Sequence, residues 1–243
     1  MKAIILAGGK GTRAKPFTDF FPKAMIPIHG KPLIDHIENY LSSFKLVDQT
    51  IIVSDFTGLG SQIKHYFDGK KNVKKIKFVQ DSGNGTAGDL LYISKLLKNN
   101  SEFVLWFVDN LCAIDIKKMH KFFKEKKSLA CIATRKYRKE ETGFATVKNG
   151  IITEFIEKPT VKLNNHECLG VYILSTKVLG EIKKKSKSKR NLNLSFDILE
   201  KLGKKKLVSA FDIGTKPWLD AESPAIIERN EKIVDKIISQ MKA

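Results

Sequence analysis

Short apolar segments rich in β-branched residues alternate with segments of helical periodicity along the first half of the chain. This alternation predicts strand–helix–strand units, which build a mostly parallel sheet with helices on both faces. We therefore expect an α/β fold. The expected strands are 2–6, 50–53, 76–80, 103–108, 129–134 and 168–174, and the expected helices between them are 33–44, 60–67, 86–97 and 115–126.

The pattern changes after about residue 140, where we expect a small β-rich insertion. Segments 144–147 and 151–156 flank Asn149-Gly150, a pair typical of the type I′ turn of a β-hairpin. The sequence contains no linker-like stretch and no hexapeptide repeat, so we predict one domain over residues 1–243 without a C-terminal β-helix domain. Later helices are expected at 176–185, 195–202 and 224–241, the last with Ser223 as N-cap and Pro224 in its first turn.

The composition is typical of a globular protein of the cytoplasm. Hydrophobic residues make up 42% of the chain, and no run approaches the ~18 apolar residues of a membrane span. The N-terminus begins directly with a strand pattern rather than a signal peptide. Cys112, Cys131 and Cys168 are isolated, and the five histidines lack metal-binding spacing. We therefore expect a cytoplasmic protein with no membrane partner.

The formal net charge of +18 comes mainly from lysine, which is dense in residues 183–190 and 204–206. A positive field attracts phosphorylated ligands and nucleic acid alike. These runs lack the aromatic residues that stack on single-stranded bases. A solvated, lysine-rich surface is the simpler interpretation, so a nucleic-acid partner is not expected. Segment 183–190 is the one we expect to be most mobile.

The first predicted strand ends in a glycine-rich stretch, residues 8–11, and two cations, Arg13 and Lys23, follow at loop spacing. Bare glycine N–H groups beside cations suit a polyphosphate. The P-loop pattern GxxxxGK[ST] is absent from the sequence. The letters of the dinucleotide fingerprint occur over residues 9–14, but the prolines at 16, 22 and 27 prevent the helix which that motif requires. An extended loop around a nucleotide is therefore expected.

Two acidic residues at the ends of apolar runs form a candidate metal site. Asp109 follows the run 103–108, and Asp220 follows Trp218 and Leu219. A carboxylate at the end of a buried strand is costly unless it meets a cation. Asp109 is expected beside the glycine loop, where it can hold Mg²⁺ against a nucleotide's phosphates. If Asp220 converges on Asp109, the two complete a metal site; the alternative is that Asp109 caps the following turn.

Two further segments have both a functional and a structural explanation. Gln80 ends a strand, where a glutamine can read a base edge with both amide groups. The glycines of 83–87 allow close approach to a flat ring, but a plain strand–helix turn with Thr86 as N-cap explains the same letters. Lys158 can reach a phosphate as a point charge, although Glu157-Lys158-Pro159 is a tripeptide common by chance.

Together these residues resemble the signature of the sugar-1-phosphate nucleotidyltransferases. The match begins with LAGGKGTR at 6–13, continues through Pro22-Lys23, and covers nearly the whole chain. The resemblance implies a Rossmann-like fold of the nucleotide-diphospho-sugar transferase type. Later elements in the same order are Gln80, 85–87, Asp109, Gly143, 157–159, 170–172 and 218–220.

The resemblance also implies an activity. A sugar 1-phosphate would attack the α-phosphorus of a nucleoside triphosphate, release pyrophosphate and form a nucleotide sugar, with Mg²⁺ or Mn²⁺ as cofactor. An oligomer of identical chains is left open. The implied catalytic residues are Arg13, Lys23, Asp109, Lys158 and Asp220, with Asp109 and Asp220 as metal ligands. The implied nucleotide-binding residues are Leu6, Ala7, Gly8, Gly9, Gly11, Thr12, Arg13, Lys23, Gln80, Gly85 and Thr86. The implied sugar-binding residues are Asn110, Gly143, Glu157, Lys158, Gly170 and Tyr172.

The chain departs from the family pattern at three places. Val108 stands where a glycine usually precedes the metal aspartate, Ala14 replaces a leucine, and residues 221–224 (Ala-Glu-Ser-Pro) replace Thr/Ile-Gly-Thr-Pro. None of these changes removes a charged catalytic residue. Gln80 favours dTTP or UTP as the nucleotide donor. Guanylyl or cytidylyl transfer, and a non-catalytic regulatory or binding subunit with the same fold, are the alternatives kept open.

Overall fold

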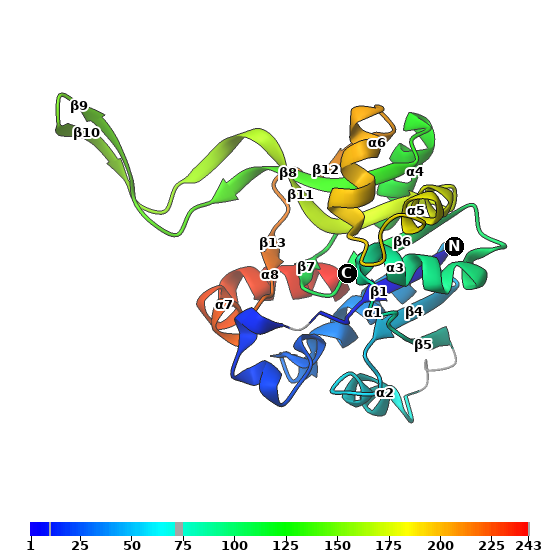
Figure 1. Ribbon diagram of the computed structural model, residues 1–243. Helices are drawn as coiled ribbons and strands as arrows, with labels where there is room; N and C mark the ends of the chain where they lie inside the picture. Colours follow the sequence, from blue (N-terminus) through cyan, green and yellow to red (C-terminus); the bar gives the residue numbers. More distant parts are fainter. Residues whose placement is uncertain (10, 71–74, 243) are drawn as a thin grey trace.

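The computed structural model describes residues 1–9, 11–70 and 75–242, and its centre is a seven-stranded sheet (Figure 1). Every neighbouring pair in this sheet is parallel except the two pairs that β11 makes, with β8 and with β6. The predicted mostly parallel sheet is therefore confirmed. In spatial order its strands are β12 (Val208–Asp212), β8 (Ala130–Lys139), β11 (Thr160–Ser175), β6 (Glu102–Phe107), β1 (Lys2–Leu6), β4 (Gln49–Ser54) and β5 (Ile76–Gln80).

Helices cover both faces of the sheet, as predicted. Along β1, Ala3 and Ile5 belong to one apolar core while Ile4 and Leu6 belong to the other, because successive side chains of a strand point to opposite faces. The first core is covered by α1 (Leu33–Ser43), α2 (Ser61–Phe67), α4 (Ile116–Lys126) and α8 (Glu231–Lys242), and the second by α3 (Gly85–Tyr92), α5 (Val178–Ser186) and α6 (Glu200–Lys204). Across the described residues, no helix has the length and apolarity that a membrane crossing requires.

Three predicted helices differ from single regular helices. The helix expected at 86–97 is α3 followed by a 3₁₀ segment, Ile93–Leu97, and the one expected at 195–202 begins as a π-helical turn, Leu194–Leu199, before α6. The last predicted helix breaks at Asn230, between α7 (Pro224–Arg229) and α8. The Asn230 side-chain amide donates to the Ile226 carbonyl at 3.0 Å, a local bond that favours an end to the helix.

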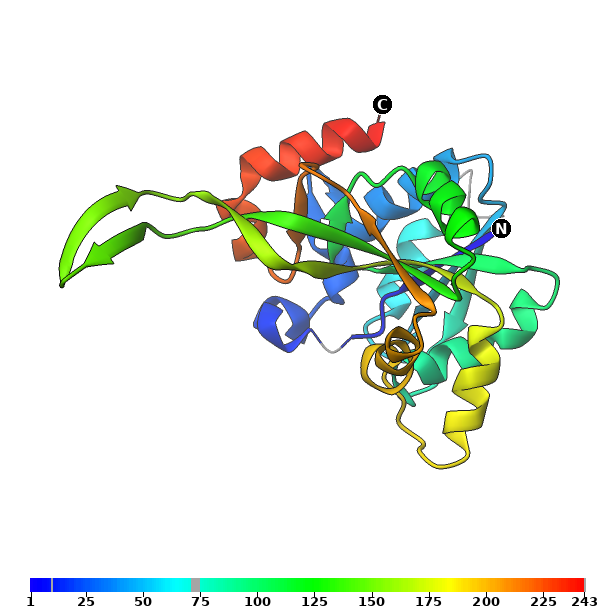
Figure 2. The same cartoon turned by 90° about the horizontal axis from the view of Figure 1, so that it is seen from above.

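Beyond the sheet, β8 and β11 continue as a ribbon that projects from the body, and the predicted hairpin forms its tip (Figures 1 and 2). β9 (Phe144–Lys148) pairs with β10 (Ile151–Ile156) across Asn149 and Gly150. These two residues have φ of 50° and 78°, as the expected type I′ turn requires. Every residue of β9 and β10 is exposed. We call residues 139–160 the arm.

Two short ladders shape the chain near the carboxyl ends of β1 and β6. β7 (Asn110–Cys112), which follows β6, pairs antiparallel with β13 (Trp218–Asp220). β2 (Pro27–Ile28) pairs with β3 (Lys31–Pro32) after the loop that carries Lys23. The β7–β13 ladder joins segments more than a hundred residues apart, and it is what places the two candidate metal ligands side by side.

Candidate active site

A cavity of about 390 Å³ lies at the carboxyl ends of β1 and β6, where α/β folds of this kind bind ligands. The structure therefore has a cavity at the edge of the sheet where the sequence predicts a nucleotide pocket. Its lining residues are Leu6, Ala7, Gly8, Gly9, Lys23, Asp81, Gly83, Gly85, Thr86, Asp89, Phe107, Val108, Asp109 and Asn191.

The glycine loop is held in shape by side chains that leave no room for a Cβ atom. Gly11 has φ of 60°, and the Thr18 hydroxyl donates to its carbonyl at 2.8 Å. A Cβ on Gly8 would lie 2.8 Å from Asp81 Oδ2, so the Asp81 carboxylate leans directly over this residue. Thr12 opens the short 3₁₀ segment Thr12–Ala14 that turns the chain away from the cavity, and Lys10 of the motif falls outside the described residues.

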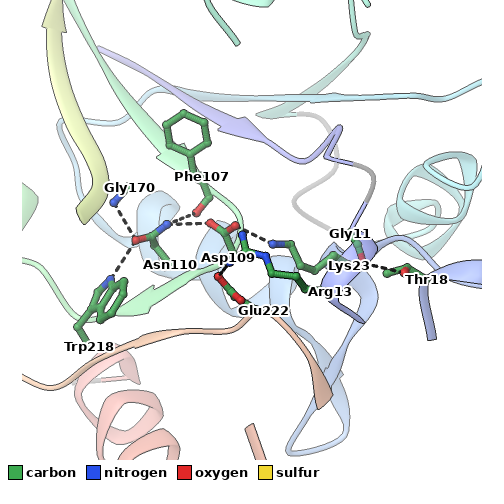
Figure 3. A network of polar contacts seen from close by, with 10 residues as sticks. All are labelled: Gly11, Arg13, Thr18, Lys23, Phe107, Asp109, Asn110, Gly170, Trp218 and Glu222. Atoms are coloured by element: carbon green, nitrogen blue, oxygen red, sulfur yellow. Dashed lines mark hydrogen bonds and ion pairs between the residues drawn. The ribbon is translucent and has the colours of Figure 1, made fainter. Parts of the chain in front are cut away.

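Lys23 and Asp109 form an ion pair at the floor of this region. Lys23 Nζ donates to Asp109 Oδ2 at 2.7 Å, and the lysine side chain is only 12% exposed. A largely buried lysine needs such a partner, because an unpaired buried charge is strongly unfavourable. The pair shows that the predicted phosphate-binding cation and the predicted metal ligand share one location (Figure 3).

Asp220 reaches the same place through the β7–β13 ladder. Asp220 is paired in register with Asn110, and the Ala221 N–H donates to the Asp109 carbonyl at 2.7 Å. Among the described residues, no donor reaches Asp220 Oδ1, which is buried. The pKa of Asp220 is raised to about 7, mainly by burial and also by the neighbouring carboxyls of Glu222 and Asp109. Asp220 is thus a carboxylate beside Asp109 that has one buried oxygen without a donor. This arrangement suits a cation bound between Asp109 and Asp220.

The Asn110 side chain is the hub of the hydrogen bonds that hold the chain segments around Asp109 together. Its Oδ1 accepts from the Gly170 N–H at 2.8 Å and from the Trp218 indole at 3.0 Å. Its Nδ2 donates to Asp109 Oδ1 at 2.8 Å (Figure 3). A Cβ on Gly170 would lie 2.2 Å from that amide nitrogen, so only glycine fits there. The structure thus places Asn110 and Gly170, predicted as sugar-binding residues, in a buried network that orients the Asp109 carboxylate.

Arg13 lies outside the cavity lining and pairs with Glu222. The arginine side chain is 70% exposed, whereas that of Glu222 is 15% exposed. Glu222 also raises the pKa of Asp220, so it links the arginine of the first motif to the candidate metal ligands. The pair holds Arg13 at the rim, within the same polar network as Asp109 and Lys23 in Figure 3.

Gln80 is not among the residues that line the cavity. Its Oε1 accepts from the Phe56 N–H at 2.8 Å, and its Nε2 donates to Asp55 Oδ1 at 3.0 Å. Both amide groups of the predicted base reader therefore hold the loop after β4. Gly85 and Thr86, by contrast, do line the cavity; Gly85 has φ of 77°, and the Thr86 hydroxyl accepts from the Leu194 N–H at 2.9 Å.

The remaining sugar-binding predictions lie apart from the cavity. A Cβ on Gly143 would lie 2.3 Å from the Phe155 ring and 2.9 Å from the Glu157 carboxylate, so these three residues gather on the arm. Lys158 lies in a different hollow of about 470 Å³, between the base of the arm and the α7–α8 corner. Tyr172 is buried in the sheet against Phe107, and burial raises its pKa to about 12.

Several cavity residues have no counterpart in the predictions from sequence. Asp81 directly follows Gln80, and its position after a strand end was a usable signal. Asn191 comes from a segment distant in sequence. The next residue, Leu192, binds this segment to the start of α3, because its N–H donates to the Asn84 carbonyl at 2.8 Å. Nothing local in the sequence indicates that Asn191 reaches the cavity.

The fold and the site together define an α/β protein in which neighbouring carboxylates and a lysine lie beside a glycine-lined pocket. The sequence profile of the nucleotidyl transferase family matches residues 2–235, and the chain belongs to that family. The resemblance read from the motifs is thereby confirmed.

Two of three similar curated relatives have names that state different nucleotide specificities. The bifunctional protein GlmU of Methanocaldococcus jannaschii is 31% identical over all of this chain and 56% of its own length. The UTP–glucose-1-phosphate uridylyltransferase of Synechocystis is 33% identical over 83% of this chain and 55% of its own length. The mannose-1-phosphate guanyltransferase of Schizosaccharomyces pombe is 26% identical over 92% and 61%, respectively. The chain thus spans little more than half the length of the curated relatives it matches.

Solved structures share the whole architecture. A Bacillus anthracis protein assigned as a glucose-1-phosphate thymidylyltransferase, in complex with a sucrose, matches with a TM-score of 0.73 and 25% identity over 96% of this chain and 95% of that one. A UDP-glucose pyrophosphorylase complexed with UDP-glucose matches with a TM-score of 0.66 and 21% identity over 99% and 98%. The second likeness supports the fold alone.

Proposed function

We propose that this protein transfers a nucleoside monophosphate from a nucleoside triphosphate to a sugar 1-phosphate and releases pyrophosphate. The observation that carries the proposal is that the Lys23–Asp109 ion pair lines a glycine-lined cavity and that the β7–β13 ladder places Asp220 beside Asp109. A protein that only binds partners has no physical need for a largely buried lysine and two neighbouring carboxylates beside such a pocket.

The chemistry asks the protein for positioning and charge neutralisation rather than for a strong base. A phosphate monoester has a second pKa near ~6, so the sugar phosphate is largely dianionic at neutral pH and is itself the nucleophile. Lys23 would exchange its partner Asp109 for the α-phosphate, where negative charge develops. The N–H groups of Gly9 and Gly11 would hold the triphosphate, and Arg13 would meet the leaving pyrophosphate from the rim.

Asp109 and Asp220 fit a divalent metal ion, which enzymes of this family generally use. The two carboxylates are adjacent through the ladder, and Asp220 Oδ1 has no donor among the described residues. Within that part of the chain no three acidic, histidine or cysteine side chains gather as a complete site, so the other ligands would be phosphate oxygens and water. Mg²⁺, when bound there, would neutralise charge on the transferred phosphate.

Within this class of reaction, the identities of the nucleotide donor and of the sugar are separate hypotheses. The hypothesis of dTTP or UTP depends on Gln80, whose amide is bonded to Phe56 and Asp55. The sugar hypotheses depend on the arm, whose residues Glu157 and Lys158 lie away from the cavity. We retain the arm residues as candidate sugar contacts that would act after the arm approaches the pocket.

The test is metal-dependent pyrophosphate release from ATP, GTP, CTP, UTP and dTTP, each paired with a panel of hexose and N-acetylhexosamine 1-phosphates. Asp109→Asn should lower turnover by at least ~100-fold, because it removes charge at the reacting phosphate. Asp48→Asn, at the opposite end of β4 from the cavity, is the matched control and should leave turnover unchanged.

If no pair of substrates gave pyrophosphate release, with folded protein and metal present, the proposal would be contradicted. In that event the non-catalytic subunit becomes the better interpretation. Val108, which lines the cavity, and Glu222, which pairs with Arg13, would then be the first residues to examine.

A further inference from the structure

The cavity has a cationic side and an acidic side. Asp109 enters it after β6 and is paired there with Lys23 from the loop after β1, whereas Asp81 enters after β5. In the sheet, β1 and β4 lie between β6 and β5. A triphosphate belongs at the side that holds Lys23. The acidic side repels phosphate, so it can receive only a part of the nucleotide that donates hydrogen bonds.

Two acidic side chains line the acidic side, and they are not equivalent. Asp89 Oδ1 accepts from the Ser82 N–H and hydroxyl, both at 2.7 Å, so Asp89 has a structural task. Asp81 is anchored through its backbone, whose N–H donates to the Ser54 carbonyl at 2.9 Å. Its carboxylate leans over Gly8 and accepts from the Gly83 N–H, and the Gln80 amide reaches Oδ1 only at 3.4 Å. Asp81 therefore keeps capacity to accept further hydrogen bonds inside the cavity.

Besides the carboxylates, two neutral amide side chains lie near this place, those of Gln80 and Asn191. The Gln80 amide is held by Phe56 and Asp55. Gly83 and Gly85 present only backbone to the cavity and leave space for a flat ring. Of the two carboxylates at this side, that of Asp81 is thus the one with capacity left to meet a base edge.

A carboxylate selects among bases by chemistry. The edge of guanine carries two adjacent donors, N1–H and the 2-amino group, which match the two oxygens of a carboxylate. Uracil and thymine present a single N3–H between two carbonyl oxygens, which the carboxylate repels. Adenine and cytosine present one amino group beside a ring-nitrogen acceptor. Only guanine satisfies both carboxylate oxygens without facing an acceptor.

We propose that Asp81 is the residue that selects the base and that it selects guanine, so that GTP is the nucleotide donor. This inference rests on the proposed function to the extent that the cavity binds a nucleoside triphosphate. It differs from the sequence hypothesis of dTTP or UTP, which depended on Gln80.

Binding measurements test the inference without requiring turnover. Titration calorimetry with Mg²⁺ should show that the wild-type protein binds GTP at least about tenfold more tightly than UTP or dTTP. Inosine triphosphate lacks the 2-amino group and should bind about tenfold more weakly than GTP. This comparison uses no variant, so it does not depend on whether a substituted protein folds.

Asp81→Asn replaces one acceptor by a donor and should weaken GTP binding by about 10- to 100-fold while leaving UTP and dTTP binding unchanged or tighter. The difference between GTP and inosine triphosphate should vanish in this variant. Asp48→Asn, whose carboxylate faces the N-terminus at the other end of the sheet, is the control and should retain the wild-type preference.

Tighter binding of UTP or dTTP by the wild-type protein would overturn the inference, and so would an equal loss for every triphosphate in Asp81→Asn. The two proposals fail separately. A GTP preference that depends on Asp81, with no pyrophosphate release from any substrate pair, would refute the proposed activity alone. Release from UTP or dTTP that is indifferent to Asp81 would refute the base assignment alone.

Discussion

The side-chain amide of Asn110 donates a hydrogen bond to the carboxylate of Asp109 at 2.8 Å, and these two neighbours in sequence have divided roles. Asp109 faces the cavity and Lys23, whereas Asn110 is buried and holds Gly170 and Trp218. The ladder partner of Asn110 is Asp220. The geometry of both candidate metal ligands therefore depends on a residue that does not line the cavity.

Replacement of Asn110 by alanine should impair both stability and catalysis. The buried Gly170 N–H and Trp218 indole would lose their acceptor, and we expect a loss of about 2 kcal/mol or more in the free energy of unfolding. Turnover should fall at least ~10-fold because Asp109 loses its orientation. Urea unfolding and pyrophosphate release measure the two effects.

The control for Asn110→Ala is Asn39→Ala. Asn39 is exposed, and its amide bonds only to the Asp35 carbonyl one turn earlier. The free energy of unfolding should change by less than ~0.5 kcal/mol in this variant. Equal effects of the two substitutions would contradict the role of Asn110 as a hub.

Gly170→Ala tests the same network from the other side. Its Cβ would lie 2.2 Å from Asn110 Nδ2, and relieving this clash should cost about 1–3 kcal/mol of stability. Gly180→Ala is the matched change, because Gly180 lies in α5 with open space around it. That substitution should stabilise the protein by up to ~1 kcal/mol through helix propensity. Thermal unfolding of the two variants side by side distinguishes them.

Asp220 makes the stability of the metal-free protein depend on pH. Its pKa is raised to about 7 in the folded protein, so the folded state keeps a proton that the unfolded chain releases near pH 4. The resulting stabilisation is fully present below pH 4 and is lost as the pH rises toward and through 7. Urea unfolding in EDTA at several values between pH 5 and pH 8 should show a steeper decline for the wild-type protein than for Asp220→Asn. Parallel curves would mean that Asp220 is ionised in the folded protein throughout this range.

The sheet could be predicted because the sequence signals for its strands and connecting helices are local. The strands β1, β4 and β6 have apolar centres, and helical periodicity between the strands dictates parallel connections. The residue types of Asn149 and Gly150 alone are enough to predict the type I′ turn between β9 and β10. The division of the last helix at Asn230 was missed, because it depends on one side-chain bond to Ile226 rather than on periodicity.

The site was harder to predict than the fold, because it depends on contacts between distant segments. Asp220 meets Asp109 only through a three-residue ladder. Gln80 looks like a base reader until its amide is found on Phe56, which precedes it by 24 positions. Asn191 reaches the cavity through backbone bonds to the start of α3. None of these pairings leaves a periodic signal in either segment.

The arm permits a test of the sugar-binding prediction. Lys158 and Glu157 lie outside the cavity, so a role in holding the sugar 1-phosphate requires the arm to approach the pocket during the reaction. If it does, Lys158→Ala should raise the KM for the sugar phosphate by about 10-fold or more and leave the KM for the nucleotide unchanged, because a charge-assisted contact is lost. Lys148→Ala, at the exposed tip of the arm, supplies the control for the loss of a lysine and should alter neither constant. Equal values for wild type and Lys158→Ala would remove this lysine from the sugar site, and the hollow it shares with the α7–α8 corner would then account for its position.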